Sequence, residues 1–240
     1  MKEILRLPAI LAIALSTCGV FAQNSAVQPV SKEGKWLERH ESLTAQAQQG
    51  GIDLLFLGDS ITYGWQTEGQ AVWQERYAPR HAANFGIGGD RTQHILWRIQ
   101  NGELDGIKPK VVVLKIGTNN RGQEKDTGKV RNTTPEVIEG VTAVVKALRA
   151  KLPNSKILLL AIFPRGEKGE PSREQLLVIN SALAKLDNGK RVKFLDIGSK
   201  FLEPDGTLSK AIMPDLIHLS KKGYQIWADA MEPTLAAMLK

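Results

Sequence analysis

The hydrophobic residues of this 240-residue chain gather in short continuous runs from residue 52 onward. Val, Ile and Leu occupy successive rather than alternate positions in these runs, which is typical of strands buried on both faces of a parallel sheet. Amphipathic segments with helical spacing separate the runs. This order predicts an α/β fold, a three-layer α/β/α sandwich around a five-stranded parallel sheet. The predicted strands cover residues 52–58, 82–87, 110–117, 156–163 and 192–198.

Polar residues at the starts of the amphipathic segments indicate where helices begin. Thr134 is followed by proline and is predicted to be an N-cap, because proline suits the first helical position. Ser172, with a glutamine three residues later, has the pattern of a capping box. Ser220 precedes a C-terminal helix, which Pro233 is expected to bend or interrupt. Residues 35–49 are expected to form a further helix that packs on the sheet.

The first 22 residues have the pattern of a secretory signal peptide. Two basic residues are followed by an apolar stretch over residues 7–15, and small residues end at Ala22. The apolar stretch is too short for a membrane span. We therefore expect a leader over 1–22, an N-terminal segment with its helix over 23–50, and one domain over 51–240. The mature protein is expected to be secreted or periplasmic.

Cys18 is the only cysteine and lies inside the predicted leader. Cleavage after Ala22 would leave a protein without thiols or disulfides. The alternative is a lipoprotein signal, because residues 15–18 loosely resemble one, and lipidation of Cys18 would tether the protein to a membrane surface. Thr17 is a poor residue immediately before a lipidated cysteine, so the sequence favours the secretory signal.

The formal net charge is +7. The basic residues are spread along the chain without an arginine-rich run or a basic amphipathic helix, and nucleic-acid binding usually needs a clustered patch. We expect an evenly solvated basic surface, with weak attraction to anionic glycans or lipid head groups as the alternative.

Polar and glycine residues follow four of the five predicted strands. In a parallel sheet, the carboxyl ends of the strands share one edge, so these residues are expected to lie close together. Taken alone, each has a structural interpretation as a turn, a helix cap or a buried histidine. The residues are Gly58, Asp59 and Ser60, then Gly88 and Gly89, then Asn119 and Asn120, and finally Asp215 and His218.

Together these residue types suit acyl transfer. A serine such as Ser60 is a weak nucleophile until an imidazole takes its proton, and a carboxylate must orient that imidazole. His218 follows Asp215 by three residues, whereas His40, His81 and His94 have no acid poised in a nearby loop. The developing oxyanion needs preorganised donors. Candidates are the Ser60 amide, a glycine amide at Gly88 or Gly89, and the Asn119 side chain.

Metal and cofactor chemistry have weaker support. The chain has no paired histidine spacing, no cysteine cluster and no acidic ligand loop, so no metal site is predicted. A dinucleotide site is the other interpretation of the glycines after the second strand. However, "GIGGDR" departs from the G-x-G-x-x-G pattern, and no acid is placed to bind a ribose. No cofactor is expected.

Four short blocks, "GDSIT", "NFGIGGD", "GTNN" and "DLIH", resemble the signature blocks of the SGNH (GDSL-type) hydrolases. The segment around "NFGIGGDRTQHILWRIQNGEL" resembles the branch that holds the catalytic subunits of platelet-activating-factor acetylhydrolase type Ib. The resemblance implies a flavodoxin-like SGNH hydrolase domain over 51–240. It also implies Ser60 as nucleophile, Asp215 and His218 as its triad partners, and Gly89 and Asn119 as oxyanion donors with the Ser60 amide.

The chain departs from this pattern in two places. Ile61 stands where the family has its name-giving leucine, and the connection over 121–135 is longer than is usual in the branch. The expected function is a secreted serine esterase for acetyl or other short-chain acyl esters of glycans or small molecules. The alternatives are a non-catalytic glycan-binding module on the same fold, or a lysophospholipase or thioesterase with the same triad. The resemblance also suggests association into a homodimer, which no residue pattern of the sequence establishes.

Overall fold

The computed structural model describes residues 23–124 and 126–240. The predicted signal peptide over 1–22, with Cys18, lies outside the described residues. Five parallel strands form one sheet in the order β2-β1-β3-β4-β5. This confirms the predicted α/β class and its five-stranded parallel sheet. The strands are β1 (Leu54–Gly58), β2 (Ala82–Gly86), β3 (Val111–Lys115), β4 (Lys156–Leu160) and β5 (Val192–Leu195).

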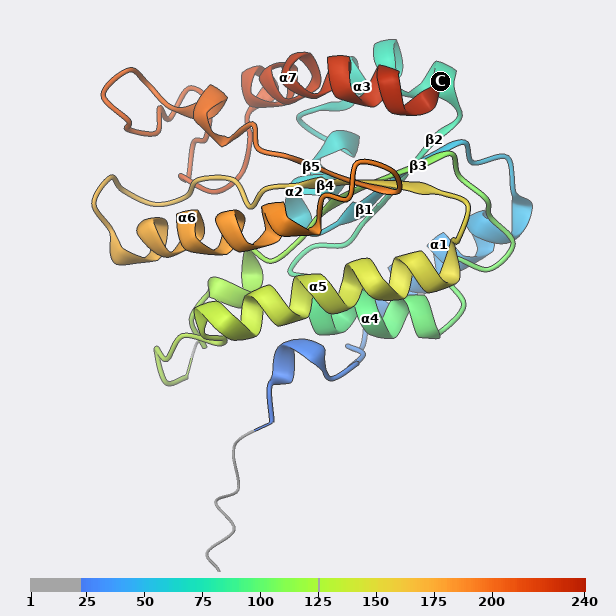
Figure 1. Cartoon of the computed structure of the whole chain (residues 1–240), viewed down its shortest axis with the longest axis horizontal. Helices are drawn as coiled ribbons and strands as arrows, with labels where there is room; N and C mark the ends of the chain where they lie inside the picture. The colour runs from blue at the N-terminus through green and yellow to red at the C-terminus, as the bar shows by residue number, and fades with distance from the viewer. Residues whose placement is uncertain (1–22, 125) are drawn as a thin grey trace, which may run out of the picture.

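Helices cover both faces of the sheet (Figure 1). Leu55 and Leu57 of β1 belong to one buried cluster, and Leu54 and Phe56 belong to another. Because successive side chains of a strand point to opposite faces, a strand buried on both sides has to be apolar throughout. The first cluster includes residues of α1 (Lys35–Gln49), α4 (Thr92–Gln100), α5 (Thr134–Lys151) and α6 (Pro171–Leu183). The second includes residues of α2 (Ser60–Tyr63), α3 (Gln70–Arg76) and α7 (Lys221–Leu239).

The strand order places a topological switch point between β1 and β3. The chain moves from β1 to β2 on one side and later returns to pair β3 with the other side of β1. Connections that leave in opposite directions open a crevice at the carboxyl ends of the strands, where open α/β sheets bind ligands. Gly58 ends β1 in register with Gly86 of β2 and Lys115 of β3. The residue pair after Gly58 therefore lies at this crevice.

Two predicted helix starts were wrong in detail. The N-cap of α5 is Thr133, whose backbone N–H donates to Glu136 Oε2 at 2.7 Å and whose side chain accepts from the Glu136 N–H. Thr133 wins over Thr134 because only its spacing to Glu136 closes a capping box. Helix α6 begins at Pro171, with Glu170 as N-cap. Proline suits the first helical position, so Ser172 lies inside the first turn.

The C-terminal helix begins where the sequence predicts, but it is not interrupted at the proline. Ser220 is the N-cap, as predicted, and its Oγ accepts from the Gly223 N–H at 3.3 Å. Pro233 removes one backbone donor, yet α7 continues through it to Leu239. Met231 and Leu235, on either side of the proline, are fully buried against the second cluster. Tertiary packing thus outweighs the local cost of the proline.

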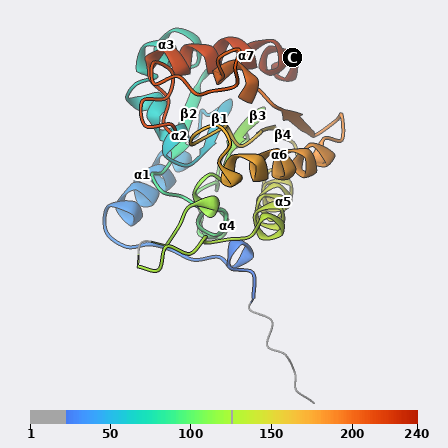
Figure 2. The ribbon, with the colours of Figure 1, turned by 90° about the vertical axis from the view of Figure 1, so that its left-hand side faces the viewer.

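The N-terminal segment before α1 is tied to the folded body (Figure 2). Ala26 is fully buried, and its carbonyl accepts from Thr92 Oγ1 at 2.7 Å. Gly140 of α5 leaves the room for this contact, because a Cβ there would lie 2.9 Å from the Ala26 Cβ. The segment therefore packs across α4 and α5 before it reaches α1.

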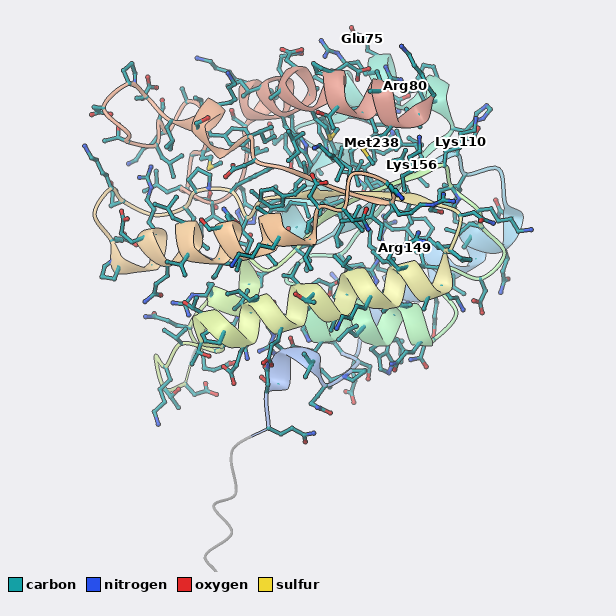
Figure 3. All side chains as sticks on the ribbon, in the orientation of Figure 1. Glu75, Arg80, Lys110, Arg149, Lys156 and Met238 are labelled. Carbon is teal, nitrogen blue, oxygen red and sulfur yellow. The ribbon has the colours of Figure 1, made fainter. Side chains whose placement is uncertain are left out.

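At the amino ends of the strands, Lys156 lies beside Met238 (Figure 3). There, Lys156 at the start of β4 donates to the Met238 carbonyl near the end of α7 at 2.7 Å. This bond ties the last helix to the edge remote from the crevice. Throughout the described residues, no helix has both the length and the hydrophobicity needed to cross a bilayer.

Candidate active site

At the end of β1, the sequence leaves open whether Asp59 and Ser60 cap a helix or take part in chemistry. The structure gives each residue one of these roles. Asp59 is the N-cap of α2, and its Oδ1 accepts from the Ile61 N–H at 3.0 Å. The Asp59 side chain is fully buried, whereas Ser60 is half-buried. The capping interpretation therefore holds for the acid and leaves the serine hydroxyl free for another partner.

That partner is His218, which comes from the loop before α7. The Ser60 Oγ lies 2.9 Å from His218 Nε2, and His218 Nδ1 lies 2.6 Å from Asp215 Oδ2. Asp215 Oδ1 also accepts the backbone N–H groups of Ile217 at 3.0 Å and His218 at 2.7 Å. A hydroxyl, an imidazole and a carboxylate thus stand in one hydrogen-bonded line.

The electrostatics of this line favour its working protonation state. Partial burial raises the pKa of Asp215, but the hydrogen bonds from the His218 ring and the two backbone amides outweigh it and hold that pKa below its usual range. An ionised Asp215 accepts from Nδ1, so the tautomer it favours presents an Nε2 lone pair to the Ser60 hydroxyl. The arrangement can accept the proton of Ser60 when that oxygen attacks an acyl carbon.

The loop that holds these residues is strained at one position. Leu216 has a φ of 59°, in the left-handed region that side-chain-bearing residues rarely adopt. Its carbonyl accepts from the Gly166 N–H at 3.0 Å, so the loop after β4 braces it. Such strain persists only where the surroundings over-determine the backbone, and here it sits between Asp215 and His218.

The structure also brings Gly89 and Asn119 to this edge. Gly89 has a φ of 72° and is exposed, and Asn119 Nδ2 donates to the Asp90 carbonyl at 2.9 Å. An asparagine amide carries two N–H donors, so this bond orients Asn119 and leaves the second donor for a ligand. Among the described residues, the backbone N–H groups of Ser60 and Gly89 donate to no protein acceptor.

Asn120, the neighbour of Asn119, is a structural residue. It is fully buried, its Oδ1 accepts from the Thr92 N–H at 3.0 Å, and its Nδ2 donates to Asn132 Oδ1 at 3.0 Å. The interpretation of the asparagine pair as a local cap thus applies to Asn120. This network joins the start of α4 to the connection after β3.

Sequence reasoning missed Lys115, which pairs with Asp59, the residue before Ser60. It is fully buried at the end of β3, with its Nζ 3.3 Å from Asp59 Oδ2 and 2.6 Å from Thr118 Oγ1. Burial lowers the pKa of Lys115, and Asp59 opposes that shift. The available signal was a lysine inside the otherwise apolar run "VVVLKIG", because a buried lysine needs a partner. The ion pair ties β3 to the turn that carries Ser60.

The other three histidines lie apart from Ser60, although the fold places an acid near each of them, with Asp90 Oδ1 3.7 Å from His94 Nδ1. His40 Nδ1 lies 2.9 Å from Glu103 Oε2, His81 Nδ1 lies 3.0 Å from Asp53 Oδ2, and His94 Nδ1 accepts from the Arg91 N–H at 2.9 Å. An acid nearby in the sequence was therefore a poor criterion for excluding a histidine. A hydrogen bond to the Ser60 hydroxyl is the better criterion. Of the four histidines, all of which the structure describes, His218 alone makes that bond.

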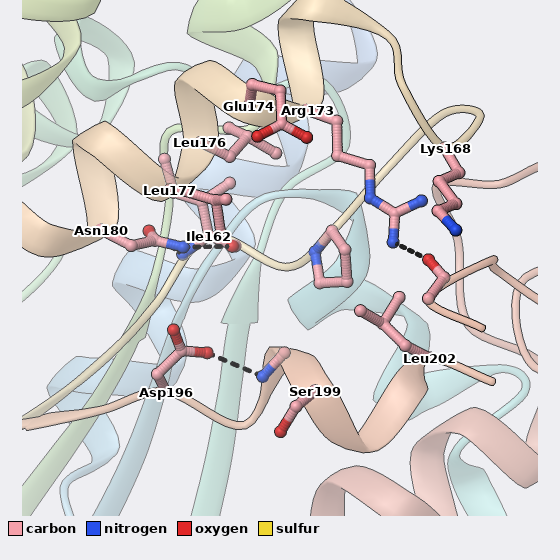
Figure 4. Close-up of a pocket in the computed structure, with 13 residues that line it drawn as sticks. Ile162, Lys168, Arg173, Glu174, Leu176, Leu177, Asn180, Asp196, Ser199 and Leu202 are labelled. Atoms are coloured by element: carbon pink, nitrogen blue, oxygen red, sulfur yellow. Dashed lines mark hydrogen bonds between the residues drawn. The ribbon is translucent and has the colours of Figure 1, made fainter. Parts of the chain in front are cut away.

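A separate pocket of about 360 Å³ lies between α6 and the segment after β5 (Figure 4). Its walls include Leu176, Leu177, Arg173 and Asp196, and neither Ser60 nor His218 lines it. Within the described residues, no three His, Cys, Asp or Glu side chains converge in a way that could hold a metal ion.

The parallel sheet, with a serine at its switch point, is the architecture that the sequence predicts for an SGNH hydrolase. A family model of the GDSL-like lipase/acylhydrolase family matches residues 56–226, so the chain belongs to that family. This confirms the resemblance of the four sequence blocks, and the protein is an acylhydrolase of the SGNH/GDSL class.

Relatives of known name are similar over most of the chain. The human platelet-activating factor acetylhydrolase IB subunit alpha1 is 37% identical over 215 residues, covering 89% of this chain and 88% of the relative. The rat subunit alpha2 is 38% identical over 200 residues, covering 83% and 82%.

Solved structures share the fold at lower identity. A GDSL-like lipase from Bacteroides thetaiotaomicron has a TM-score of 0.65 at 16% identity, covering 83% of this chain and 97% of its own. An acetylxylan esterase from Geobacillus stearothermophilus, solved as a catalytic mutant, has a TM-score of 0.58 at 21% identity, with 76% and 93% covered.

Proposed function

We propose that this protein is an exported serine esterase that hydrolyses acetyl or other short-chain acyl esters. The observation that carries the proposal is the line from the Ser60 hydroxyl through His218 to Asp215, at 2.9 and 2.6 Å. The names of the relatives support a short acyl group, since they include acetylhydrolase subunits and an acetylxylan esterase.

In the proposed reaction, Ser60 Oγ attacks the ester carbonyl while His218 Nε2 takes the hydroxyl proton. The Ser60 and Gly89 amides and the Asn119 side chain donate to the resulting oxyanion. When the tetrahedral intermediate collapses, the bond to the alcohol breaks and His218 returns the proton to the leaving oxygen. Water then attacks the acyl-Ser60 ester with the same help from His218, and the acid leaves while Ser60 regains its proton.

The proposal is tested with p-nitrophenyl esters from acetate to octanoate. We expect activity to be highest with acetate, and Ser60→Ala to lower kcat by about 10³-fold or more, because only oxyanion stabilisation and binding remain. Activity that survives Ser60→Ala would contradict the assignment of the nucleophile. A preference for octanoate would favour a lysophospholipase or thioesterase instead, and a folded protein without turnover of any ester would favour a binding module.

Export is proposed from residues 1–22 alone. Expression in a secreting bacterial host and sequencing of the mature N-terminus tests it, with Gln23 as the expected first residue. A lipid-modified N-terminus at Cys18 would replace this by the lipoprotein alternative.

A further inference from the structure

We propose that the alcohol half of the substrate carries an anionic group, a carboxylate or a phosphate, and that a cationic rim of Lys32, Arg91 and Arg131 binds it beside the ester. This inference rests on the esterase function proposed above and names its substrate class. An acetyl group has no place for a charge, so with acetyl esters the anion has to belong to the alcohol.

Lys32 reaches the active-site edge from outside the region that the family model matches, residues 56–226. Its Nζ donates to the Gly89 carbonyl at 2.8 Å. The segment that carries it is fixed on both sides, since the Val30 N–H donates to the Gln93 carbonyl at 3.3 Å and Trp36 Nε1 donates to Asp90 Oδ1 at 2.6 Å. Lys32 is therefore a fixed part of this edge.

Arg131 and Arg91 extend the rim across the connection after β3. Arg131 Nη1 donates to the Asn119 carbonyl at 3.2 Å, and its Nε lies 3.3 Å from Glu124 Oε1. Arg91 Nη1 lies 3.3 Å from the same carboxylate oxygen. Glu124 thus bridges the two guanidinium groups.

The charges at the rim do not balance. In the part of the chain that the structure describes, Arg91 and Arg131 share one acid, Glu124, whose side chain is 49% exposed. Lys32 lies 4.0 Å from Asp90, which is fully buried and is also bound to Arg98. Among the described residues, basic side chains thus outnumber exposed acids at this rim.

The positive charge of the rim contributes to the lowered pKa values of Lys32 and His94. Burial lowers the pKa of Lys32, and the nearby Arg91 and Arg131 lower it further against the opposing effect of Asp90. Burial lowers the pKa of His94 to about 3, with contributions from Lys32, Arg91 and Arg131 among others. A positive potential of this kind attracts an anion and stabilises it once bound.

The rim contacts the residues that are proposed to bind the oxyanion. Lys32 and Arg131 each donate to the carbonyl of a proposed oxyanion donor, Gly89 and Asn119 respectively. Both cations therefore contact the residues whose N–H groups are proposed to bind the oxyanion. Glu124 already occupies the anionic position between the guanidinium groups, and a substrate carboxylate or phosphate would displace it.

The test compares three acetyl esters with similar phenol leaving groups. These are 4-acetoxyphenylacetate, with a carboxylate, 4-acetoxybenzylphosphonate, with a phosphonate, and the neutral 4-acetoxyphenylacetamide. We expect kcat/KM for the preferred anion to exceed that for the amide by about tenfold, as one charge-assisted contact supplies. The preference between carboxylate and phosphonate identifies the source of the anion.

Variants assign the preference to the rim. Arg131→Gln should lower kcat/KM for the anionic esters more than for the neutral amide, so that the ratio falls toward one, whereas Glu124→Gln should increase the ratio. Lys110→Gln is the matched control, because Lys110 is an exposed lysine at the remote edge of the sheet (Figure 3). It should leave the ratio unchanged.

Two results would overturn the rim: equal kcat/KM for all three esters in the wild type, or a loss in Arg131→Gln that is equal on charged and neutral esters. The second result would indicate that Arg131 only supports the loop. If the folded wild type hydrolyses none of these esters or the p-nitrophenyl esters, the esterase proposal itself fails.

Discussion

At the scale of single residues, the site depends on a carboxylate that is held by more than its histidine. Asp215 accepts three hydrogen bonds, from the Ile217 and His218 amides and from the His218 ring. Each bond favours the ionised form, which is why its pKa lies below the usual range despite partial burial. The same bonds hold the strained loop, so the acid orients the imidazole and shapes the backbone that carries it.

Asp215→Asn should lower kcat by about 10²- to 10⁴-fold, because a neutral amide favours the wrong imidazole tautomer and does not stabilise the imidazolium. Steady-state kinetics with p-nitrophenyl acetate measure the loss, and circular dichroism checks that the fold survives. Full activity in a folded Asp215→Asn protein would show that His218 needs no acid.

At the scale of elements, close packing at two glycines places α2 at the crevice. A Cβ at Gly58 would lie 2.2 Å from the Lys115 carbonyl oxygen, and a Cβ at Gly86 would lie 2.2 Å from the Tyr63 nitrogen. Both neighbours are backbone atoms, which cannot yield as the end of a side chain can. The ends of β1 and β2 thus need glycine for α2, with Ser60 at its start, to sit this close to the sheet.

Gly86→Ala should lower the free energy of unfolding by about 1–3 kcal/mol, since an extra methyl in a packed region forces the backbone to shift. It should also lower kcat, because α2 carries Ser60. Urea denaturation and ester hydrolysis measure the two effects. Gly88→Ala is the control for stability, because a Cβ at Gly88 meets no atom within 4 Å. Equal stability of the two variants would contradict the packing argument.

At the scale of the whole molecule, one buried arginine connects elements that are far apart in the chain. Arg98 of α4 is fully buried and bonds Asp90 after β2, Glu103 after α4 and the Phe85 carbonyl of β2. Burial alone would lower the pKa of Arg98, but the two carboxylates more than reverse that effect. The loop through Gly89 is thereby anchored to the core.

Arg98→Met should lower the free energy of unfolding by about 3–5 kcal/mol, because it leaves two buried carboxylates without their counter-charge. The exposed pair of Lys110 and Asp53 provides the control, with Lys110 labelled in Figure 3. Lys110→Gln should cost about 1 kcal/mol or less, since a solvated pair contributes little. Similar losses in denaturant titrations of the two variants would refute a special role for the buried network.

Much of the fold could be predicted because its signals are local. The continuous apolar runs identified all five strands and their parallel arrangement, and Ser220 marked the start of α7. The start of a helix was harder to predict where two neighbouring residues could be the N-cap, as with Thr133 and Thr134. The choice depends on which of them has the spacing to form the capping-box hydrogen bonds with Glu136. Pro233 shows the opposite case, in which packing over the whole helix outweighs a strong local signal.

The sequence by itself determined that Ser60, Gly89, Asn119, Asp215 and His218 would share one edge, because each follows a strand of a parallel sheet or, for the last two, the loop after the final strand. Only the tertiary structure decided which partners these residues meet. The pairing of Lys115 with Asp59, the binding of Lys32 to the Gly89 carbonyl and the bridging of Arg91 and Arg131 by Glu124 all join segments distant in the chain. Periodicity and capping report on neighbours within a few residues, whereas ion pairs form wherever the folded backbone brings charges together.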